Sequence, residues 1–460
     1  MTRGLPVLLV CLACGAPPVA LPDGGLVDDE PVDAGEVRPD AGNGLADAGT
    51  GDAGATAPDA GAPADGGLVI YPFGATHSPL TAQLVRNLAI IAGRSPRNAD
   101  AFMKVGDSNT VNTNFLSCFA GPNVDLAGRA VLQPTIDAFK ATRLGGATPF
   151  DRVSRSAIVG WSAGAALTGT PPPVEQELAD TNARFATVMF GTNDIQSMNL
   201  DAYARNLFAL VDLLVSRGVV PVVTAIPPRD DSVDADRQVP LYNGVARALA
   251  QSRGVPFVDL ERELRRLPNH GIGSDGLHLN VLLQGGFARG CVLSSAGLQF
   301  GHNQRNLVTL EALRRARDAV VAGVAADVSA DVRRGTGTAQ EPFLIDSVPF
   351  VDVRDTRRDG ARGLDRYDGC SMANEGGPEV LYRLDVTTTQ TLRVVVVSLG
   401  TADLDVHVLR GAAAASACVA RNDKVLRVTV TPGTWYLSVD TYVSAGTARA
   451  GEYALLVFPE

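Results

Sequence analysis

Lysine and histidine are scarce in this chain of 460 residues, and net charge is scarce outside one short stretch. Lysine occurs only at positions 104, 140 and 424, so arginine supplies most of the positive charge. The formal net charge is -10, but residues 15–67 hold eleven acidic side chains and one basic side chain, Arg38. The rest of the chain is therefore close to neutral, which excludes the basic surface typical of nucleic-acid-binding proteins.

Long hydrophobic runs are missing after the N-terminus, so no later segment is expected to cross a membrane. Residues 5–13 form a short apolar run behind Arg3, which is typical of a signal peptide. The ending Leu12-Ala13-Cys14-Gly15 resembles a bacterial lipobox, although Cys11 stands where leucine is usual. It predicts a signal peptide over 1–14 and a lipid-anchored Cys14 at the outer membrane or cell surface. The alternative is a plain secretory signal cleaved nearby, and both predict export.

The acidic stretch 15–67 contains five Asp-Ala-Gly triplets and almost no aromatic or β-branched residue. Such a composition cannot bury enough apolar surface to fold. It predicts a disordered linker that spaces the folded parts from the membrane.

Only six cysteines are present, and four of them follow the signal region. Export permits disulfides. The simplest pairing joins Cys118 with Cys291 and Cys370 with Cys418, one bridge per expected domain; the two other connectivities stay open. A bridge that closes a loop as long as the first contributes about 4 kcal/mol in the chain-entropy model.

Residues 68–334 alternate between short apolar runs and helical patterns. The expected strands are 101–106, 156–160, 186–190, 219–225 and 255–259, and the expected helices include 201–216, 241–252 and 304–323. Fully apolar strands of this length are typical of a parallel sheet that is covered on both faces. This predicts an α/β fold with its functional loops at the carboxyl ends of the strands.

Residues 335–460 have a different sequence pattern, in which short runs of β-branched or aromatic residues are separated by turns. The expected strands are 378–384, 391–399, 404–410, 424–431, 433–440 and 451–458. This pattern predicts a small all-β sandwich.

The polar residues that follow the α/β strands form a compact chemical set. Ser108 follows the first strand, Asn193 the third and the Asp275/His278 pair the fifth. Ester hydrolysis needs a nucleophile, a base, a group that orients the base, and donors for the oxyanion. Ser108, His278, Asp275 and Asn193 can fill these four roles in that order.

The same residues resemble the SGNH, or GDSL-like, hydrolases. Gly106-Asp107-Ser108, Gly191-Thr192-Asn193-Asp194 and Asp275-Gly276-Leu277-His278 match three motif blocks in order over roughly 68–325. The resemblance implies a flavodoxin-like three-layer sandwich and ester hydrolysis without a metal or other cofactor. It implies Ser108 as nucleophile, His278 as base, Asp275 as its orienter, and an oxyanion hole from Ser108 N–H, Gly160 N–H and Asn193. The chain departs from the family pattern at Asn109, where leucine is usual, and at Leu279, where proline is common.

Ser162, in Gly160-Trp161-Ser162-Ala163-Gly164, is a rival nucleophile of the α/β-hydrolase type. Three prolines begin at position 171, so the helix that such an elbow needs would be very short. This spacing favours Ser108. Two further alternatives are a non-catalytic surface-binding lipoprotein with a degenerate hydrolase domain, and a peptidase.

Residues 340–460 resemble the bacterial pre-peptidase C-terminal domain, a β-sandwich whose implied role is surface attachment. Asp403, Asp405 and His407 alternate along one expected strand and share a face. They would fit a metal cluster, but sheet-face polarity is the preferred interpretation, so no metal site is predicted.

Together these features predict an exported serine esterase, with a lipid anchor, that acts as a monomer on carboxylic esters, acetyl esters included. Lipid, small-molecule and acetylated-glycan esters all stay open as substrates.

Overall fold

The computed structural model describes residues 67–370 and 373–460. The expected signal peptide over 1–14, the lipidated Cys14 and the acidic linker up to residue 66 lie outside this part of the chain. No helix within the described ranges is both long and apolar enough to span a membrane. The described residues fall in one compact unit, so the expected domain boundary near residue 335 stays a prediction.

The α/β part is built on a four-stranded parallel sheet in the order β1-β2-β3-β4. Its strands are β1 (Asn98–Gly106), β2 (Ala183–Met189), β3 (Val220–Thr224) and β4 (Phe257–Val258). All seven residues of β2 are buried, as are all five of β3. Continuous burial of this kind is expected for strands that are covered on both faces.

The expected strand over 156–160 is wrong: only Ala157 pairs, in a parallel bridge with Gly106. The hydroxyl groups of Ser154 and Ser156 both donate to the Lys104 carbonyl oxygen. Side-chain hydrogen bonds of this kind compete with a regular backbone ladder. The bridge still lies on the free side of β1, so the strand order remains that of a flavodoxin-like sheet.

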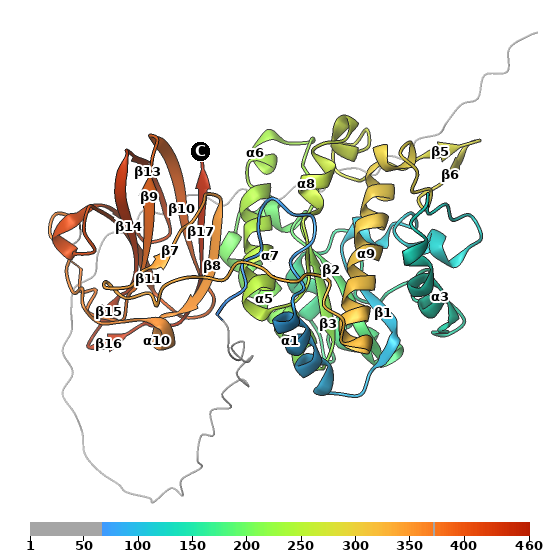
Figure 1. Cartoon of the computed structure of the whole chain (residues 1–460), viewed down its shortest axis with the longest axis horizontal. Coiled ribbons are helices and arrows are strands. Elements are labelled where there is room, and N and C mark those ends of the chain that lie inside the picture. Colours follow the sequence, from blue (N-terminus) through green and yellow to red (C-terminus); the bar gives the residue numbers. More distant parts are fainter. Residues whose placement is uncertain (1–66, 371–372) are drawn as a thin grey trace, which may run out of the picture. The chain divides into compact units, whose positions relative to one another are not determined.

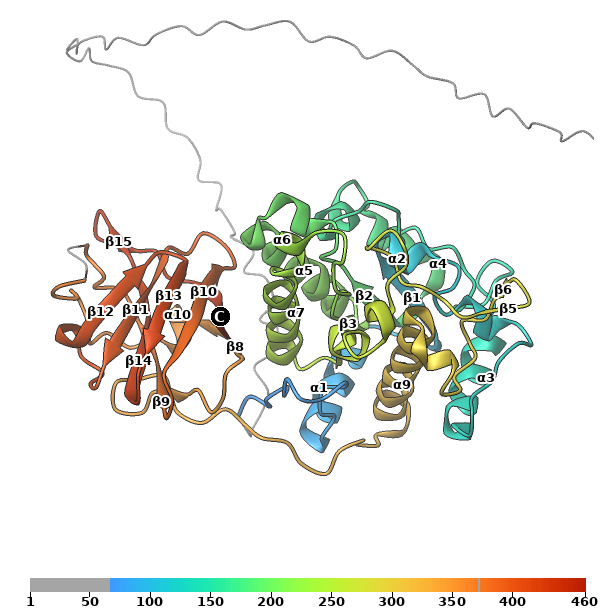
Figure 2. The same cartoon turned by 90° about the horizontal axis from the view of Figure 1, so that it is seen from above.

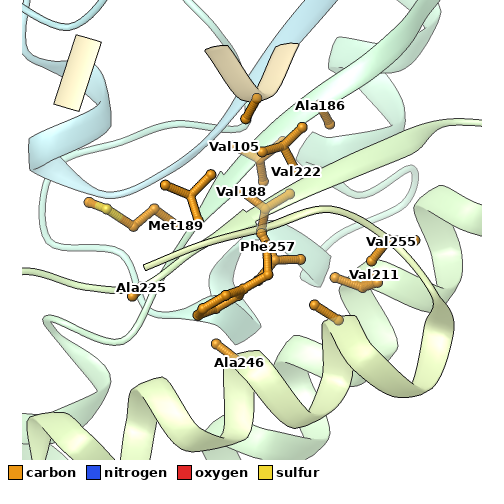
Figure 3. Close-up of a cluster of buried hydrophobic side chains, with 14 of the residues drawn as sticks. Val105, Ala186, Val188, Met189, Val211, Val222, Ala225, Ala246, Val255 and Phe257 are labelled. Atoms are coloured by element: carbon orange, nitrogen blue, oxygen red, sulfur yellow. The ribbon is translucent and has the colours of Figure 1, made fainter. Parts of the chain in front are cut away.

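Helices cover both faces of this sheet, with α1 packed beside α9 and α5 packed beside α7 (Figures 1 and 2). The helices are α1 (Ala82–Gly93), α2 (Ser108–Val111), α3 (Gln133–Ala141), α4 (Pro173–Thr181), α5 (Leu200–Ser216), α6 (Val233–Asp236), α7 (Val239–Arg253), α8 (Leu260–Leu264) and α9 (Gly301–Ala322). Figure 3 shows Val105, Val188 and Phe257 of the sheet gathered with Val211 of α5 and Ala246 of α7. A short hairpin, β5 (Leu283–Gln284) with β6 (Phe287–Ala288), precedes α9.

The C-terminal part is a two-sheet sandwich, in the orders β13-β10-β17-β8 and β12-β11-β14-β9-β7. Its elements are β7 (Phe343–Leu344), β8 (Phe350–Asp355), α10 (Thr356–Asp359), β9 (Val380–Val386), β10 (Gln390–Ser398), β11 (Leu404–Arg410), β12 (Cys418–Asn422), β13 (Val425–Val430), β14 (Gly433–Thr441), β15 (Val443–Ser444), β16 (Thr447–Ala448) and β17 (Glu452–Pro459). The fold class is therefore the expected one, although β7, β8 and β12 were not expected from the sequence.

Two disulfides join the cysteines in the simplest expected pairing. Cys118 is bonded to Cys291, with their Cα atoms 5.7 Å apart, and Cys370 is bonded to Cys418, with their Cα atoms 5.9 Å apart. The first bridge ties the chain just after the Ser108 turn to the chain just before α9. The second fastens the loop before β9 to β12.

Candidate active site

The turn over residues 106–108, called the nucleophile turn after the predicted role of Ser108, joins the carboxyl end of β1 to α2. Ser108 is the first residue of α2. A Cβ atom on Gly106 would collide with Thr110 Oγ1 and would lie 2.7 Å from the Met189 carbonyl oxygen, so only glycine fits there. The Asp107 side chain accepts a hydrogen bond from the Asn109 N–H at 3.0 Å and caps the helix. This tight turn projects Ser108 from the sheet edge.

A chain of hydrogen bonds joins Ser108, His278 and Asp275. His278 Nε2 lies 2.8 Å from Ser108 Oγ, and His278 Nδ1 lies 2.6 Å from Asp275 Oδ2. When Nδ1–H donates to the carboxylate, Nε2 is free to accept the serine proton. Asp275 Oδ1 accepts the N–H groups of Leu277 and His278, each at 3.0 Å, which holds the carboxylate in position.

Asp275 stays ionised over the useful pH range. Burial raises its pKa, but the backbone N–H and the ring of His278, together with the Leu277 N–H, lower it to about 2. The side chains of Asp275 and His278 are 53% and 36% exposed. The three groups therefore lie at an open surface rather than in a closed cavity.

Two side chains after β2 anchor the loop that carries Gly160. Asn193 Nδ2 donates to the Trp161 carbonyl oxygen at 2.9 Å, and the buried Asp194 carboxylate accepts the Ala163 N–H at 3.1 Å. An amide has two N–H donors, so Asn193 keeps one for a ligand. Gly160 has φ +80° and open space on the side where a Cβ would lie. The oxyanion roles of Asn193 and Gly160 remain predictions.

Asn109 links the nucleophile turn to the histidine loop, a role that sequence reasoning missed. Its Oδ1 accepts the Leu279 N–H at 3.3 Å, so the two residues that depart from the family pattern are hydrogen-bonded to each other. Arg305 of α9 lies beneath the turn, with its guanidinium donating to the Asn109 carbonyl oxygen at 2.6 Å and to Thr110 Oγ1 at 3.0 Å. Burial lowers the pKa of Arg305 to about 9. No local sequence signal marked this arginine.

Arg229, also missed, connects the Asn193 loop to the Asp275 loop. Its Nη1 donates to the Thr192 carbonyl oxygen at 2.6 Å, and its Nε pairs with Asp231 at 2.7 Å. The Asp231 N–H in turn donates to the Gly276 carbonyl oxygen at 3.0 Å. One buried guanidinium thus holds together two loops that are far apart in sequence.

Ser162 does not occupy a nucleophile elbow. It precedes a 3-10 helix of five residues, Ala163–Leu167, and no strand leads into it beyond the single bridge at Ala157. Within residues 67–370 and 373–460, the hydroxyl that hydrogen-bonds to a histidine ring is that of Ser108 rather than that of Ser162. The geometry therefore favours Ser108.

Asp107 makes the stability of the nucleophile turn depend on pH. Burial raises its pKa from 3.8 to about 6, against the lowering effects of Arg305 and the Asn109 N–H. Because the pKa of Asp107 is higher in the folded state than in the unfolded state, the protonated carboxyl group stabilises the folded protein below about pH 4. This stabilisation is lost as the pH rises through about 6, and the free energy of unfolding then falls by about 3 kcal/mol. We expect the Tm of Asp107→Asn, relative to the parent, to rise between pH 4 and pH 7.5 in thermal melts. The exposed Asp137→Asn is the control, and a Tm difference that does not change with pH would contradict the assignment.

One known family matches part of the chain. Residues 105–283 match the model of the GDSL-like Lipase/Acylhydrolase family. A search of curated proteins found no match.

Three solved structures are similar in part. A GDSL-like lipase from Bacteroides thetaiotaomicron shares 13% identity over 51% of this chain and 98% of its own, with a TM-score of 0.31. A two-domain esterase active on acetylated mannans shares 12% identity over 83% and 96%, with a TM-score of 0.32. The pre-peptidase C-terminal domain of a Bacillus anthracis collagenase shares 14% identity over 24% and 88%, with a TM-score of 0.17.

The family match covers the Ser108 turn, the Asn193 loop and His278. It confirms the resemblance to the GDSL-like hydrolases, while the roles of the individual residues stay predictions. Residues 105–283 match the GDSL-like lipase/acylhydrolase family, and this match supports an ester-cleaving hydrolase.

Proposed function

We propose that this protein hydrolyses short-chain carboxylic esters, acetyl esters in particular, with Ser108, His278 and Asp275 as its catalytic triad. The observation that carries the proposal is the unbroken set of hydrogen bonds from Asp275 through His278 to Ser108 Oγ. A degenerate, non-catalytic domain would be expected to lack one of these groups. A serine peptidase would use the same three groups, so a casein assay beside the ester assay separates the two activities.

The mechanism follows from these contacts. Ser108 Oγ attacks the acyl carbon while His278 Nε2 takes its proton, and Asp275 stabilises the imidazolium that forms. The Ser108 and Gly160 N–H groups and the remaining Asn193 N–H stabilise the oxyanion. His278 then protonates the leaving alcohol, and a water activated by the same ring releases the acid and restores Ser108.

The openness of the site supports a short acyl group on a polar carrier. His278 and Asp275 are exposed, and a second polar pair, His270 with Asp230 at 2.8 Å, is also exposed in this region of the chain. A long acyl chain needs an apolar pocket to gain binding energy. An acetyl group needs only the reacting atoms and the oxyanion donors.

An acyl-chain series tests this proposal. With p-nitrophenyl acetate, butyrate and octanoate, kcat/KM is expected to fall by at least about tenfold from acetate to octanoate, because added methylenes beside the exposed His278 and Asp275 stay largely in water. The rates are measured on the purified chain after subtraction of the Ser108→Ala rate. A kcat/KM that rises with chain length would point to lipid esters and overturn the choice of substrate.

We also propose that the protein is exported and anchored through Cys14. The two disulfides support an oxidising compartment, and the Leu12-Ala13-Cys14-Gly15 stretch supports lipidation. Metabolic labelling with a tagged fatty acid is expected to mark the parent and not Cys14→Ala. An exported parent that carries no label would instead indicate a plain secretory signal.

A further inference from the structure

One face of the sheet that contains β11 is covered by residues 360–370 and 373–379, the described part of the loop between α10 and β9, rather than by water. Leu404, Val406 and Val408 point into the core between the two sheets, so Asp405 and His407 point to the opposite face. On that face, Leu364 and Tyr367 of the loop pack with Leu381 and Leu409 in a separate buried cluster. The disulfide between Cys370 and Cys418 fastens this loop to β12.

Three potential metal ligands are buried beneath the loop. Glu375 and His407 are 0% exposed and Asp405 is 4% exposed, and one ligand atom from each lies within 4.8 Å of the other two. Sheet-face polarity, the interpretation that the sequence favoured for Asp405 and His407, does not explain these side chains because they do not face water. Asp403 lies just before β11 and is not part of this group.

The ligand atoms are only partly compensated. Among the described residues, Glu375 accepts no N–H hydrogen bond; its carboxyl group faces that of Asp405, with which it shares a side-chain hydrogen bond, and His407 Nε2 has no hydrogen-bond partner. Arg421 Nη2 pairs with Asp405 at 2.9 Å and with the exposed Asp423 at 3.3 Å, but it lies 3.8 Å from Glu375. One shared guanidinium therefore leaves two buried carboxyl groups side by side, an arrangement that is costly unless a shared proton or a bound cation compensates it.

The imidazole of His407 is held ready to bind a ligand. The Tyr367 ring stacks on it, with the centroids 3.6 Å apart and an angle of 8° between the planes. Tyr367 is held in turn by its hydroxyl group, which donates to Asp440 Oδ2 at 2.5 Å. Outer contacts that fix a histidine ring are typical of metal sites.

We propose that Glu375, Asp405 and His407 bind a divalent transition-metal ion of the zinc class, which fastens the segment around Glu375 to β11. A nitrogen ligand beside two carboxylates suits Zn²⁺, whereas Ca²⁺ and Mg²⁺ prefer oxygen ligands alone. The ligand atoms need to approach to about 3.4 Å from one another for tetrahedral bonds of about 2.1 Å. Three protein ligands leave one position for water.

Metal binding to the purified full-length chain tests this inference. After treatment with EDTA and dialysis, the protein is titrated with ZnCl₂ or CaCl₂ and its bound metal is counted by mass spectrometry. One zinc per chain and a raised Tm are expected, with no calcium bound. Glu375→Gln and His407→Gln are each expected to weaken zinc binding by at least about tenfold. Asp423→Asn, which alters a neighbour of Arg421, is the matched control and is expected to bind zinc as the parent does.

Each other outcome overturns the proposal. Calcium bound in place of zinc would indicate an oxygen-only site elsewhere, and zinc binding that survives both substitutions would indicate another site, the catalytic His278 included. A parent that binds neither metal would mean that the buried carboxylates are compensated by a shared proton. If the variants do not fold, the parent is loaded with Co²⁺, and the absence of visible absorption bands from a nitrogen- and oxygen-bound cobalt ion counts against the site.

Discussion

Ser108→Ala is expected to lower kcat for p-nitrophenyl acetate by roughly four to six orders of magnitude. The substitution removes the Oγ atom that is proposed to form the acyl-enzyme, while Asp107 still caps α2 and Arg305 still holds the turn from beneath. The residual rate would come from the oxyanion donors and substrate binding alone. Folding is checked by the Tm, which is expected to change little because the Ser108 side chain is only partly buried.

Ser162→Ala is the matched control for this experiment. Its serine is also close to a glycine-rich turn, yet the hydroxyl that meets His278 belongs to Ser108. We expect Ser162→Ala to retain the parent rate within about twofold, in line with a surface substitution. If kcat falls equally in the two variants, or falls strongly only in Ser162→Ala, the assignment of Ser108 as the nucleophile is contradicted and Ser162 is favoured.

Asp275→Asn is expected to lower kcat by about 10⁴-fold with little loss of stability. The asparagine Oδ1 can still accept the N–H groups of Leu277 and His278, so the loop keeps its shape. Its amide would donate to His278 Nδ1, however, and the ring proton would then sit on Nε2. In that tautomer the ring cannot accept the proton of Ser108 Oγ.

Asp230→Asn provides the control because Asp230 forms the other aspartate–histidine pair, with His270 at 2.8 Å. That pair has no hydrogen bond to Ser108 among the residues described, and its loss is expected to leave kcat within a few-fold of the parent. The measurement is kcat for the acetate ester with matched melting curves. Similar losses at both positions would mean that general loop disturbance, rather than the tautomer, controls the rate.

The pKa of Asp275 also predicts how the activity depends on pH. Because its folded pKa is depressed to about 2, the carboxylate supports catalysis at all pH values above that point. Its protonation therefore cannot cause a loss of activity near pH 4 or 5.

The reacting groups could be predicted because their chemistry is local and ordered. A serine, an amide and an aspartate–histidine pair each follow a strand, and parallel strands bring their carboxyl ends to one edge. The connecting groups could not be predicted in this way. Asn109, Arg229 and Arg305 act through contacts with backbone atoms of distant segments, and no motif spacing encodes such contacts.

The wrong predictions of secondary structure and burial also arise from contacts between segments that are distant in sequence. The apolar run over 156–160 has strand propensity, but serine hydroxyl groups bonded to Lys104 leave one bridge in its place. Glu177 of α4 is 1% exposed and pairs with Arg152 at 2.9 Å, a burial that no local pattern marks. Strand β12 has a weak pattern of its own and depends on β11 and a disulfide.

The sequence alone determined the order of the motif blocks and the chemical type of each reacting residue. It also determined the α/β and all-β fold classes of the two parts. These properties depend on neighbours along the chain. The tertiary structure decided which of two serines meets the histidine, which loops are tied together by Arg229, and that Asp405 and His407 are buried with Glu375. Those outcomes depend on which segments pack against each other, and burial changes the energetic cost of every polar group involved.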